Sequence, residues 1–453
     1  MRRYLAARFF VLALAVRLAV VAWAGGRFDA AADGRYYHIL ATRLSQGLGY
    51  TWAWPDGVVT YAAHYPVGYP ALLAGPYALF GASVEVAMAA HALLGAIGVA
   101  AMVVAAERVA GRRLARWVGV VATLHPGLWA YTAALMTEGV TAALWALGLA
   151  ACLLAVRAAR RGPWLVALGV ILGLATLVRP QSLLLAPIVG WLAWPRRGWL
   201  GAAGAVALTL AVCAPWTVRN CERMGRCALV SVNSGWNLLI GTDDRGRGGW
   251  APLEVPPSCR EVFDEAEKDR CFAAAARARI AERPLDWLAL APRKLGVTFD
   301  YCGAAGWYLH EANPAAFPER DKAILGVVET TVERLLLLAA LLGVFLPRRR
   351  RLGGRLVGLV AVASALSPHA TPAWLLLAGG LAWRGRRRAR ARDVADLAVA
   401  AMILAVAAVH AAFFGAGRYQ LVLWLVLCLP AAQGLRLVGR WARQAVARRR
   451  QTA

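Results

Sequence analysis

Side chains that could abstract a proton or hold a phosphate group occur at the ends of apolar segments. The first hydrophilic stretch carries Asp29, Asp33 and Tyr37, and it continues to His64 and Tyr65. Later polar residues interrupt otherwise apolar sequence, and they are Glu138, Arg179, Arg219, Asn237, Arg418 and Tyr419. A carboxylate can act as a general base toward a hydroxyl or an amine, and an arginine can hold a departing phosphate. These residue types therefore suit a transfer reaction in which an anionic phosphate leaves.

Each of these residues, taken singly, could be an ordinary charge at a membrane interface. Their joint occurrence at the ends of apolar segments argues against that explanation, because ionisable groups at membrane depth are costly without a partner or a ligand. Arg17 is different, since it lies in the middle of the first apolar run. Snorkelling, pairing with another helix and a functional role explain Arg17 equally well.

The composition indicates that these residues sit in a membrane protein. The chain has 453 residues, of which 60% are hydrophobic, and its mean hydropathy is +0.53, which is too apolar for a water-soluble protein of this size. The net charge of +26 comes mostly from arginine runs between apolar segments, where the positive-inside rule places them. Such runs orient helices and contact anionic membrane lipids. We therefore predict an all-α polytopic membrane protein and exclude nucleic acid as a partner.

The arginine runs also predict the topology. Each run should lie on the cytoplasmic side, so an even number of crossings separates each run from the next. About twelve transmembrane helices satisfy this parity, at 9–24, 83–106, 117–132, 137–156, 164–178, 181–194, 200–215, 323–346, 353–367, 371–383, 396–414 and 420–436. Both termini are then cytoplasmic in a multi-pass protein of the cytoplasmic (inner) membrane. The first helix is expected to be a retained anchor, since residues 25–27 make a poor signal-peptide cleavage site.

Two long segments fall on the outer side in this topology. Residues 25–82 are rich in aromatic side chains, and an interfacial helix is expected over 36–44. Residues 216–322 hold most of the acidic residues and should form a small extracytoplasmic domain of helices and turns. The predicted organisation is therefore an N-terminal transmembrane module (1–215) with its first outside loop (25–82), the loop domain (216–322) and C-terminal transmembrane helices (323–453).

Five of the eight cysteines lie in the second outside segment. In an oxidising compartment, Cys221 with Cys227 and Cys259 with Cys271 are the locally plausible disulfides, which leaves Cys302 unpaired. The other three, in apolar segments, are expected to be small core residues, namely Cys152, Cys213 and Cys428. No spacing typical of a zinc site occurs, so no protein-built metal site is predicted. A divalent cation held by Asp29, Asp33 or Glu138 stays an open alternative.

Ordered motifs in the chain resemble those of a known family. They are Asp33-Gly34 with the sequence to Tyr50, Tyr65-Pro66-Val67-Gly68-Tyr69-Pro70, Met136-Thr137-Glu138, Arg179-Pro180, Pro215-Trp216 with the sequence to Asn220, residues 233–241, and Phe413 to Tyr419. In this order they resemble the GT-C glycosyltransferases of the protein O-mannosyltransferase type (family 39) and their bacterial relatives, including the aminoarabinose transferase of lipid A. The resemblance covers roughly the first half of the chain well and the rest loosely.

The resemblance implies a GT-C fold and an inverting transfer of a sugar from a polyprenyl-phosphate carrier to a glycan, lipid or protein acceptor. The family's motif in the first outside loop is Asp-Glu, and its Asp falls on Asp33, which is thereby the expected general base. Gly34 stands where the Glu is common, so a second acid would come from Asp29 or Glu138. The expected contacts to the carrier phosphate are His64, Arg179, Arg219 and Arg418, and further substrate contacts are Tyr37, Tyr65, Asn237 and Tyr419.

Two other functions stay open at this point. A transporter or a flippase for lipid-linked saccharides would be expected to have ionisable residues near the middle of the membrane and broken helices in repeated halves. A non-catalytic relative would only bind a lipid-linked saccharide. Convergence of Asp33, Glu138 and Arg418 in one outward-facing cavity would favour an enzyme, whereas dispersal over the surface would favour ordinary interfacial charges.

Overall fold

The computed structural model describes residues 4–243, 245–345, 352–388 and 390–452. Apart from one small hairpin, the secondary structure of these residues is helical, and long helices form a bundle. The bundle helices are α1 (Tyr4–Ala24), α4 (Val84–Leu124), α5 (Pro126–Ala130), η1 (Tyr131–Ala133), α6 (Thr137–Arg157), α7 (Gly162–Val178), η2 (Pro180–Leu184), α8 (Leu185–Ala193), α9 (Gly198–Arg223), α15 (Glu319–Phe345), α16 (Leu352–Leu366), α17 (Thr371–Gly385), α18 (Ala391–Ala412), η5 (Gly417–Gln420) and α19 (Leu421–Thr452).

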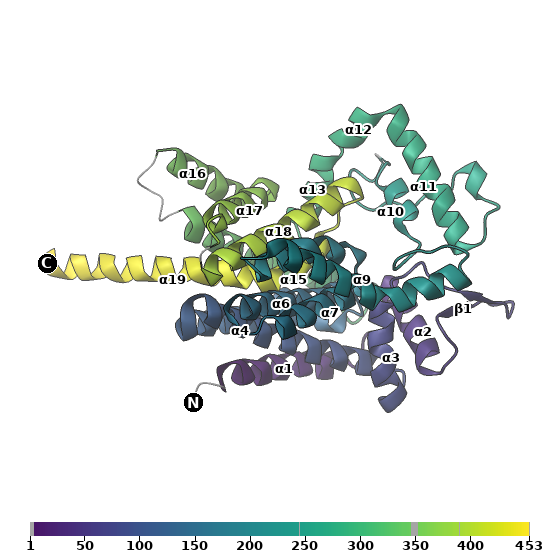
Figure 1. Ribbon diagram of the computed structural model, residues 1–453, viewed down its shortest axis with the longest axis horizontal. Helices are drawn as coiled ribbons and strands as arrows, with labels where there is room; N and C mark the ends of the chain where they lie inside the picture. The colour runs from purple at the N-terminus through teal and green to yellow at the C-terminus, as the bar shows by residue number, and fades with distance from the viewer. Residues whose placement is uncertain (1–3, 244, 346–351, 389, 453) are drawn as a thin grey trace.

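Among the described residues, six helices are long and apolar enough to cross a membrane: α1, α4, α6, α9, α18 and the helix over 417–444. Helices α1, α4, α6 and α19 run roughly side by side in Figure 1. The protein is therefore an all-α multi-pass membrane protein, as the composition predicts. The shorter apolar helices α7 and α16, and the η2–α8 segment, coincide with predicted spans. The total of about twelve crossings stays a prediction.

The predicted span at 117–132 is wrong in detail. Helix α4 runs through that region only to Leu124, and the chain then leaves helical geometry at His125, whose ψ is 114°. Pro126 follows, and a proline forces the residue before it out of the α-helical region. Helix α4 is itself two helices joined at a kink, since Ala110 and Gly111 are non-helical, with φ of 74° at Gly111. This turn lies within the arginine run at 108–116.

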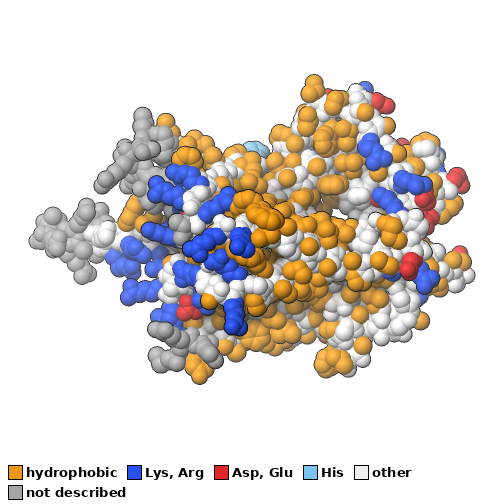
Figure 2. Space-filling model, in the orientation of Figure 1, with side chains coloured by type: hydrophobic (Ala, Val, Ile, Leu, Met, Phe, Trp, Pro, Cys, Tyr) orange, Lys and Arg blue, Asp and Glu red, His pale blue; other side chains and the backbone are white. Residues whose placement is uncertain are grey.

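Charge is distributed unevenly along the bundle. Both termini lie at one end, on the left of Figure 1, and the outside-loop elements α2, β1, α10 and α11 lie at the other end. Lysine and arginine side chains gather near the end with the termini, whereas acidic side chains are more frequent at the far end (Figure 2). This separation is the one that the positive-inside rule leads us to expect if both termini are cytoplasmic.

The first outside segment folds into α2 (Asp33–Ser45), an antiparallel hairpin of β1 (Thr51–Ala53) and β2 (Val59–Tyr61), and α3 (Gly68–Phe80). The expected interfacial helix exists but begins three residues earlier than predicted, so that Asp33 falls in its first turn. Tyr37 and Leu40 are buried on the predicted apolar face, and Arg35 is exposed. The sequence analysis did not predict the hairpin.

The second outside segment contains α10 (Ser234–Ile240), η3 (Pro257–Cys259), α11 (Glu265–Glu282), α12 (Pro284–Ala289), α13 (Ala291–Phe299) and α14 (Ala304–Ala312). The predicted span 200–215 extends within α9 as far as Arg223, so the helix carries the chain beyond the expected membrane boundary. Both expected disulfides are present, Cys221–Cys227 and Cys259–Cys271. Cys302, Cys152, Cys213 and Cys428 are free and buried, as predicted.

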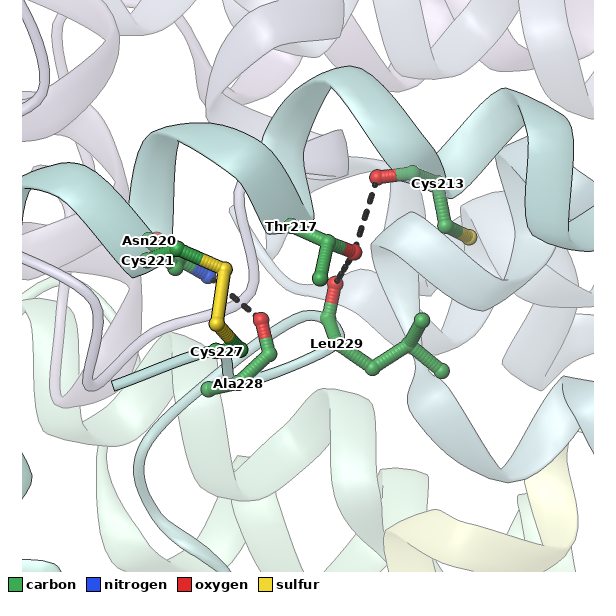
Figure 3. Close-up of a disulfide and its surroundings, with 7 residues drawn as sticks. All are labelled: Cys213, Thr217, Asn220, Cys221, Cys227, Ala228 and Leu229. Carbon is green, nitrogen blue, oxygen red and sulfur yellow. Dashed lines mark hydrogen bonds between the residues drawn. A yellow bond between two sulfur atoms is a disulfide. The ribbon is translucent and has the colours of Figure 1, made fainter.

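The first disulfide fixes the turn at the end of α9 (Figure 3). The returning strand of chain is also held to the helix by side chains. The Asn220 side-chain amide donates to the Ala228 carbonyl over 2.9 Å, and the Thr217 hydroxyl donates to the Leu229 carbonyl over 3.0 Å. Covalent and hydrogen-bonded links together anchor the second outside segment to the bundle.

Candidate active site

Asp33 lies at the start of α2, where the chain changes direction. The preceding residue, Ala32, has a φ of 48°, which is uncommon for a residue other than glycine. One oxygen of the Asp33 carboxylate (Oδ1) accepts a hydrogen bond from the Tyr65 hydroxyl over 3.2 Å. The other oxygen (Oδ2) accepts from Arg418 Nη1 over 3.1 Å, and the side chain keeps 35% of its surface exposed. Asp33 is therefore held in position and still accessible.

Glu138 occupies the first turn of α6, where the positive end of the helix dipole favours a carboxylate. Its side chain is only 1% exposed. Glu138 Oε1 accepts from Arg179 Nη1 over 2.7 Å, and Oε2 accepts from the Tyr131 hydroxyl over 2.7 Å. The Thr137 hydroxyl accepts a further hydrogen bond from Arg179 over 3.0 Å. Glu138 is therefore a buried carboxylate with its charge compensated.

Arg418 connects the two carboxylates. Besides its bond to Asp33, its Nε lies 3.6 Å from Glu138 Oε1. Its Nη1 also donates to the hydroxyl of Tyr308, on α14 in the second outside segment. The ring of Tyr419 lies 5.1 Å from the guanidinium carbon of Arg418 and 5.1 Å from that of Arg179, within the range of cation–π attraction. Five separate parts of the chain therefore meet at this cluster, which we call the Asp33–Glu138 centre.

Close backbone packing positions the centre. At Gly417, a Cβ atom would lie 2.2 Å from the Tyr301 carbonyl oxygen, so only glycine lets the turn that carries Arg418 approach the second outside segment. At Gly34, a Cβ atom would lie 3.0 Å from the Leu135 carbonyl oxygen. A glutamate at position 34 would need the first turn of α2 to move away from this backbone. The packing thus gives a physical reason why an acid does not follow Asp33 directly.

Tyrosine side chains form one wall of the centre. The Tyr37 ring packs edge-on against Tyr65 at 5.0 Å and against Tyr69 at 5.1 Å. Burial, and next the Asp33 carboxylate, raise the pKa of Tyr65 well above its usual value. The same two causes raise the pKa of Tyr37. Both phenols are therefore neutral, so the Tyr65 hydroxyl keeps the proton that it donates to Asp33.

Four of the residues singled out in the sequence do not join the centre. Asp29 is exposed in the turn between α1 and α2. Arg219 donates to the backbone carbonyls of Ala62 and Tyr50, each over 2.9 Å, so it ties α9 to the first outside segment. Asn237 is half-buried on α10. His64 packs edge-on against Tyr65 at 5.0 Å but faces another cavity, lined by α10 and α11.

The structure also identifies residues that the sequence analysis missed. Tyr131 and Tyr308 each bond directly to a charged member of the centre, and His410 stacks on Tyr419 with ring centroids 4.0 Å apart. Arg17 is buried, at 1% exposure, so it does not snorkel. It donates to its own helix, at the Ala13 carbonyl. The chain has 12 tyrosines, and nothing local in the sequence separates Tyr131 or Tyr308 from the others.

The centre does not fit a divalent cation held by Asp29, Asp33 or Glu138. Arginine side chains already face the oxygens of Asp33 and Glu138, and Asp29 lies elsewhere. Across 4–243, 245–345, 352–388 and 390–452, no three His, Cys, Asp or Glu side chains come close enough together to hold a metal ion.

Comparison with known proteins gives a family match over part of the chain and a similar fold over all of it. Residues 64–218 match the family model described as dolichyl-phosphate-mannose-protein mannosyltransferase. The oligosaccharyltransferase of Archaeoglobus fulgidus, in its apo form, shares 14% identity with a TM-score of 0.51, and the match covers 100% of this chain and 52% of that one. The chain therefore has the all-helical, multi-pass membrane fold expected of a GT-C glycosyltransferase. The predicted fold is thus confirmed.

Two further solved structures resemble the chain, and neither is close to it in sequence. The same oligosaccharyltransferase in complex with zinc and sulfate matches with 14% identity and a TM-score of 0.50, over 97% of this chain and 50% of that one. ArnT from Cupriavidus metallidurans, bound to undecaprenyl phosphate, shares 18% identity with a TM-score of 0.40, over 94% of this chain and 77% of that one. The chain spans about half the length of the oligosaccharyltransferase that it matches. No curated protein sequence matches it.

The family match and the centre overlap only in part. The matched region, residues 64–218, contains Glu138 and Arg179, whereas Asp33 and Arg418 lie outside it, on either side. The tertiary structure brings all four together. The pairing of Asp33 with Arg418 is therefore an observation that the family match does not supply.

Proposed function

We propose that the protein is an inverting glycosyltransferase that moves a sugar from a polyprenyl-phosphate carrier to an acceptor at the outer face of the cytoplasmic membrane. The observation that carries this proposal is the contact of Arg418 with both Asp33 and Glu138. It joins a reachable base to a fixed positive charge at the end of the bundle opposite the termini. The matched family acts on a dolichyl-phosphate sugar, which supports a lipid-phosphate donor.

In the proposed step, Asp33 takes the proton from an acceptor hydroxyl. The hydroxyl oxygen attacks the anomeric carbon of the donor sugar, and the bond between that carbon and the phosphate oxygen breaks. The carrier phosphate leaves with the bonding electron pair, and the configuration at the anomeric carbon inverts. Asp33 suits the base because it is the more exposed of the two carboxylates, at 35% against 1% for Glu138.

The arginines are proposed to compensate the charge of the leaving phosphate. Arg418 and Arg179 both contact Glu138, which fixes them before substrate arrives and so lowers the cost of reorganisation. Glu138 is therefore proposed as a positioning residue for the arginines, and the second acid sought in place of Gly34 is Glu138 and not the exposed Asp29. Tyr37, Tyr65 and Tyr419 are proposed to border the substrate.

We also propose the topology of the chain. Both termini lie in the cytoplasm, residues 25–82 and 216–322 lie outside, and boundaries at 215 and 322 separate the loop domain from the transmembrane parts. The basic end of the bundle, which holds both termini, supports this orientation. Arg219 and Asn237 are proposed to shape the outer loops, since Arg219 uses its donors on backbone carbonyls.

Substitution of the base tests the proposal. Membranes containing the Asp33→Asn variant are incubated with a radiolabelled polyprenyl-phosphate sugar and cell-envelope acceptors. We expect loss of transfer with normal membrane insertion, because an amide cannot accept the proton. Asp56→Asn is the matched control, since Asp56 is an exposed aspartate in the same outside segment. Transfer by Asp33→Asn at the rate of the wild type would refute Asp33 as the base.

A further inference from the structure

A cavity lies on the outer side of the protein, next to the Asp33–Glu138 centre. It has a volume of about 160 Å³ and is lined by His64, Val232, Trp236, Phe263, Glu265, Lys268 and Asp269. We call it the His64 cavity. It is formed where the first outside segment meets α10 and α11. A cavity of this size holds several water molecules, which a small polar ligand could displace.

One face of α11 provides most of the polar lining. Glu265, Lys268 and Asp269 are spaced three and four residues apart, so they project from the same side of the helix. The two Glu265 oxygens accept from the Trp52 indole N–H over 2.6 Å and from the backbone N–H of His64 over 2.9 Å. This carboxylate therefore joins α11 to the segment that carries His64.

Asp269 fixes the opposite part of the lining. Its Oδ1 accepts from the backbone N–H groups of Gly235 and Trp236, over 2.6 and 3.1 Å, at the start of α10. The Trp236 ring is held edge-on against His64 at 5.4 Å and against Phe272 at 5.2 Å. Hydrogen bonds therefore hold both Glu265 and Asp269 in the wall of the cavity, and the wall is rigid.

The charges of the cavity lining do not favour a phosphate. Glu265 and Asp269 provide two negative charges, which are balanced by Lys268 and by Arg226, whose Nη1 lies 3.3 Å from Asp269 Oδ2. His64 adds no positive charge, because burial lowers the pKa of its imidazole below the usual value, despite the nearby carboxylates. The imidazole is then neutral at pH 7 and can both donate and accept a hydrogen bond. The expected phosphate contact of His64 therefore lacks electrostatic support.

The aromatic groups suit a sugar ring. Trp236 is half-buried at the cavity, and Phe263 is 84% exposed beside it, with the Lys268 ammonium 5.7 Å from its ring centroid. The C–H face of a pyranose packs against such aromatic surfaces, while its hydroxyl groups need neutral or charged hydrogen-bonding partners. We propose that the His64 cavity binds a sugar ring of the acceptor, and that this ring is uncharged or carries an amine.

The position of the cavity agrees with a role in acceptor binding. His64 contacts the Tyr65 ring at 5.0 Å, and the Tyr65 hydroxyl donates to Asp33. A saccharide seated in the cavity is thus separated from the proposed base by the side chains of His64 and Tyr65. The inference rests on the proposed function, because it assigns the acceptor of that reaction. It narrows the acceptor from glycan, lipid or protein to one that presents a sugar.

Binding of simple sugars tests the inference without donor or turnover. The full chain is placed in lipid nanodiscs that contain no glycoside detergent. Methyl glucoside, glucosamine and glucose 6-phosphate are then compared by saturation-transfer NMR titration. We expect the first two to bind and the phosphate to bind more weakly. Preferential binding of glucose 6-phosphate would overturn the inference, as would absence of binding by all three.

Two substitutions of Trp236 locate the binding. Trp236→Ala removes the aromatic face and should weaken binding about tenfold, whereas Trp236→Phe keeps it and should stay near the wild type. Trp54→Ala is the matched control, because Trp54 is half-exposed on the hairpin of the first outside segment. Equal binding by Trp236→Ala and the wild type would refute the site. Failure of transfer by the wild type would refute the proposed function and leave this binding result standing.

Discussion

Replacement of Glu138 by glutamine gives the most direct test of how the centre is held together. The substitution keeps the size of the side chain and removes its negative charge. In the structure, Glu138 is 1% exposed and accepts from Arg179 Nη1 and the Tyr131 hydroxyl, both over 2.7 Å. The oxygen of a glutamine can still accept from Arg179, whereas its NH2 group can only donate, to the Tyr131 hydroxyl oxygen. The lost contribution is therefore the compensation of charge on Arg179 and Arg418.

The expected loss of stability follows from this burial. Removal of one partner from a buried ion pair costs about 3–5 kcal/mol. Because the hydrogen bonds survive in part, we expect Glu138→Gln to lower the free energy of unfolding by about 3 kcal/mol. Glu107→Gln is the matched control. Glu107 pairs with Arg112 over 3.8 Å with both side chains more than a third exposed, so its loss should stay within about 0.5 kcal/mol.

Unfolding in mixed micelles, followed by tryptophan fluorescence as dodecyl sulfate is added, measures both variants. The double variant Glu138→Gln/Arg179→Gln should be less destabilised than the sum of the single variants by about 2 kcal/mol, because the second change removes a charge that the first left uncompensated. Strictly additive losses, or a Glu138→Gln protein as stable as the Glu107→Gln control, would show that the carboxylate does not compensate the arginines.

Three other predictions concern the surroundings of the centre. Gly417→Ala places a Cβ atom against the Tyr301 carbonyl, so it should displace Arg418. We expect transfer activity to fall at least about tenfold and the free energy of unfolding to fall by about 1–3 kcal/mol. Gly379→Ala, whose Cβ atom would meet no atom within 4 Å, should change neither quantity. Loss of the Cys259–Cys271 disulfide, which has a sequence separation of 12, should destabilise the second outside segment by about 3 kcal/mol. Trypsin should then cleave residues 216–322 faster, and an unchanged cleavage rate would count against a structural role of the disulfide. Burial lowers the pKa of His64, so below about pH 6.5 the unfolded chain binds the proton more readily than the folded protein. The free energy of unfolding should therefore decrease as the pH falls, by up to about 1.4 kcal/mol per pH unit. His64→Gln should flatten this dependence between pH 6.5 and 5, and equal slopes for the variant and the wild type would contradict the prediction.

The helices of the bundle were predictable because their signal is local. A long apolar run must satisfy its backbone hydrogen bonds within itself in lipid, so its sequence alone predicts a helix. The disulfides were predictable for a similar reason. The cysteines of each pair are close in sequence, so closing the loop between them costs little conformational entropy. The break at His125 was missed, although the proline after it is visible in the sequence, because hydropathy continues across the break.

The site was predictable only in part. Asp33, Glu138, Arg179 and Arg418 were selected by their residue type and by their position at the ends of apolar segments, and the structure joins them. His64 and Arg219 were selected by the same reasoning, yet His64 faces a separate cavity and Arg219 binds backbone carbonyls. The sequence does not distinguish these cases, because the partner of a polar side chain comes from a distant part of the chain.

Sequence by itself determined that this is an all-helical membrane protein, which end of it is basic, and which residue types were available for chemistry outside the membrane. Tertiary structure alone decided which of those residues meet. Asp33 and Arg418 are 385 positions apart, and their contact depends on the close approach of the turn at Gly417 to the second outside segment. A buried charge without a partner is costly, so the packing of the chain and the pairing of its charges depend on each other. Only the folded chain shows which residues form those pairs.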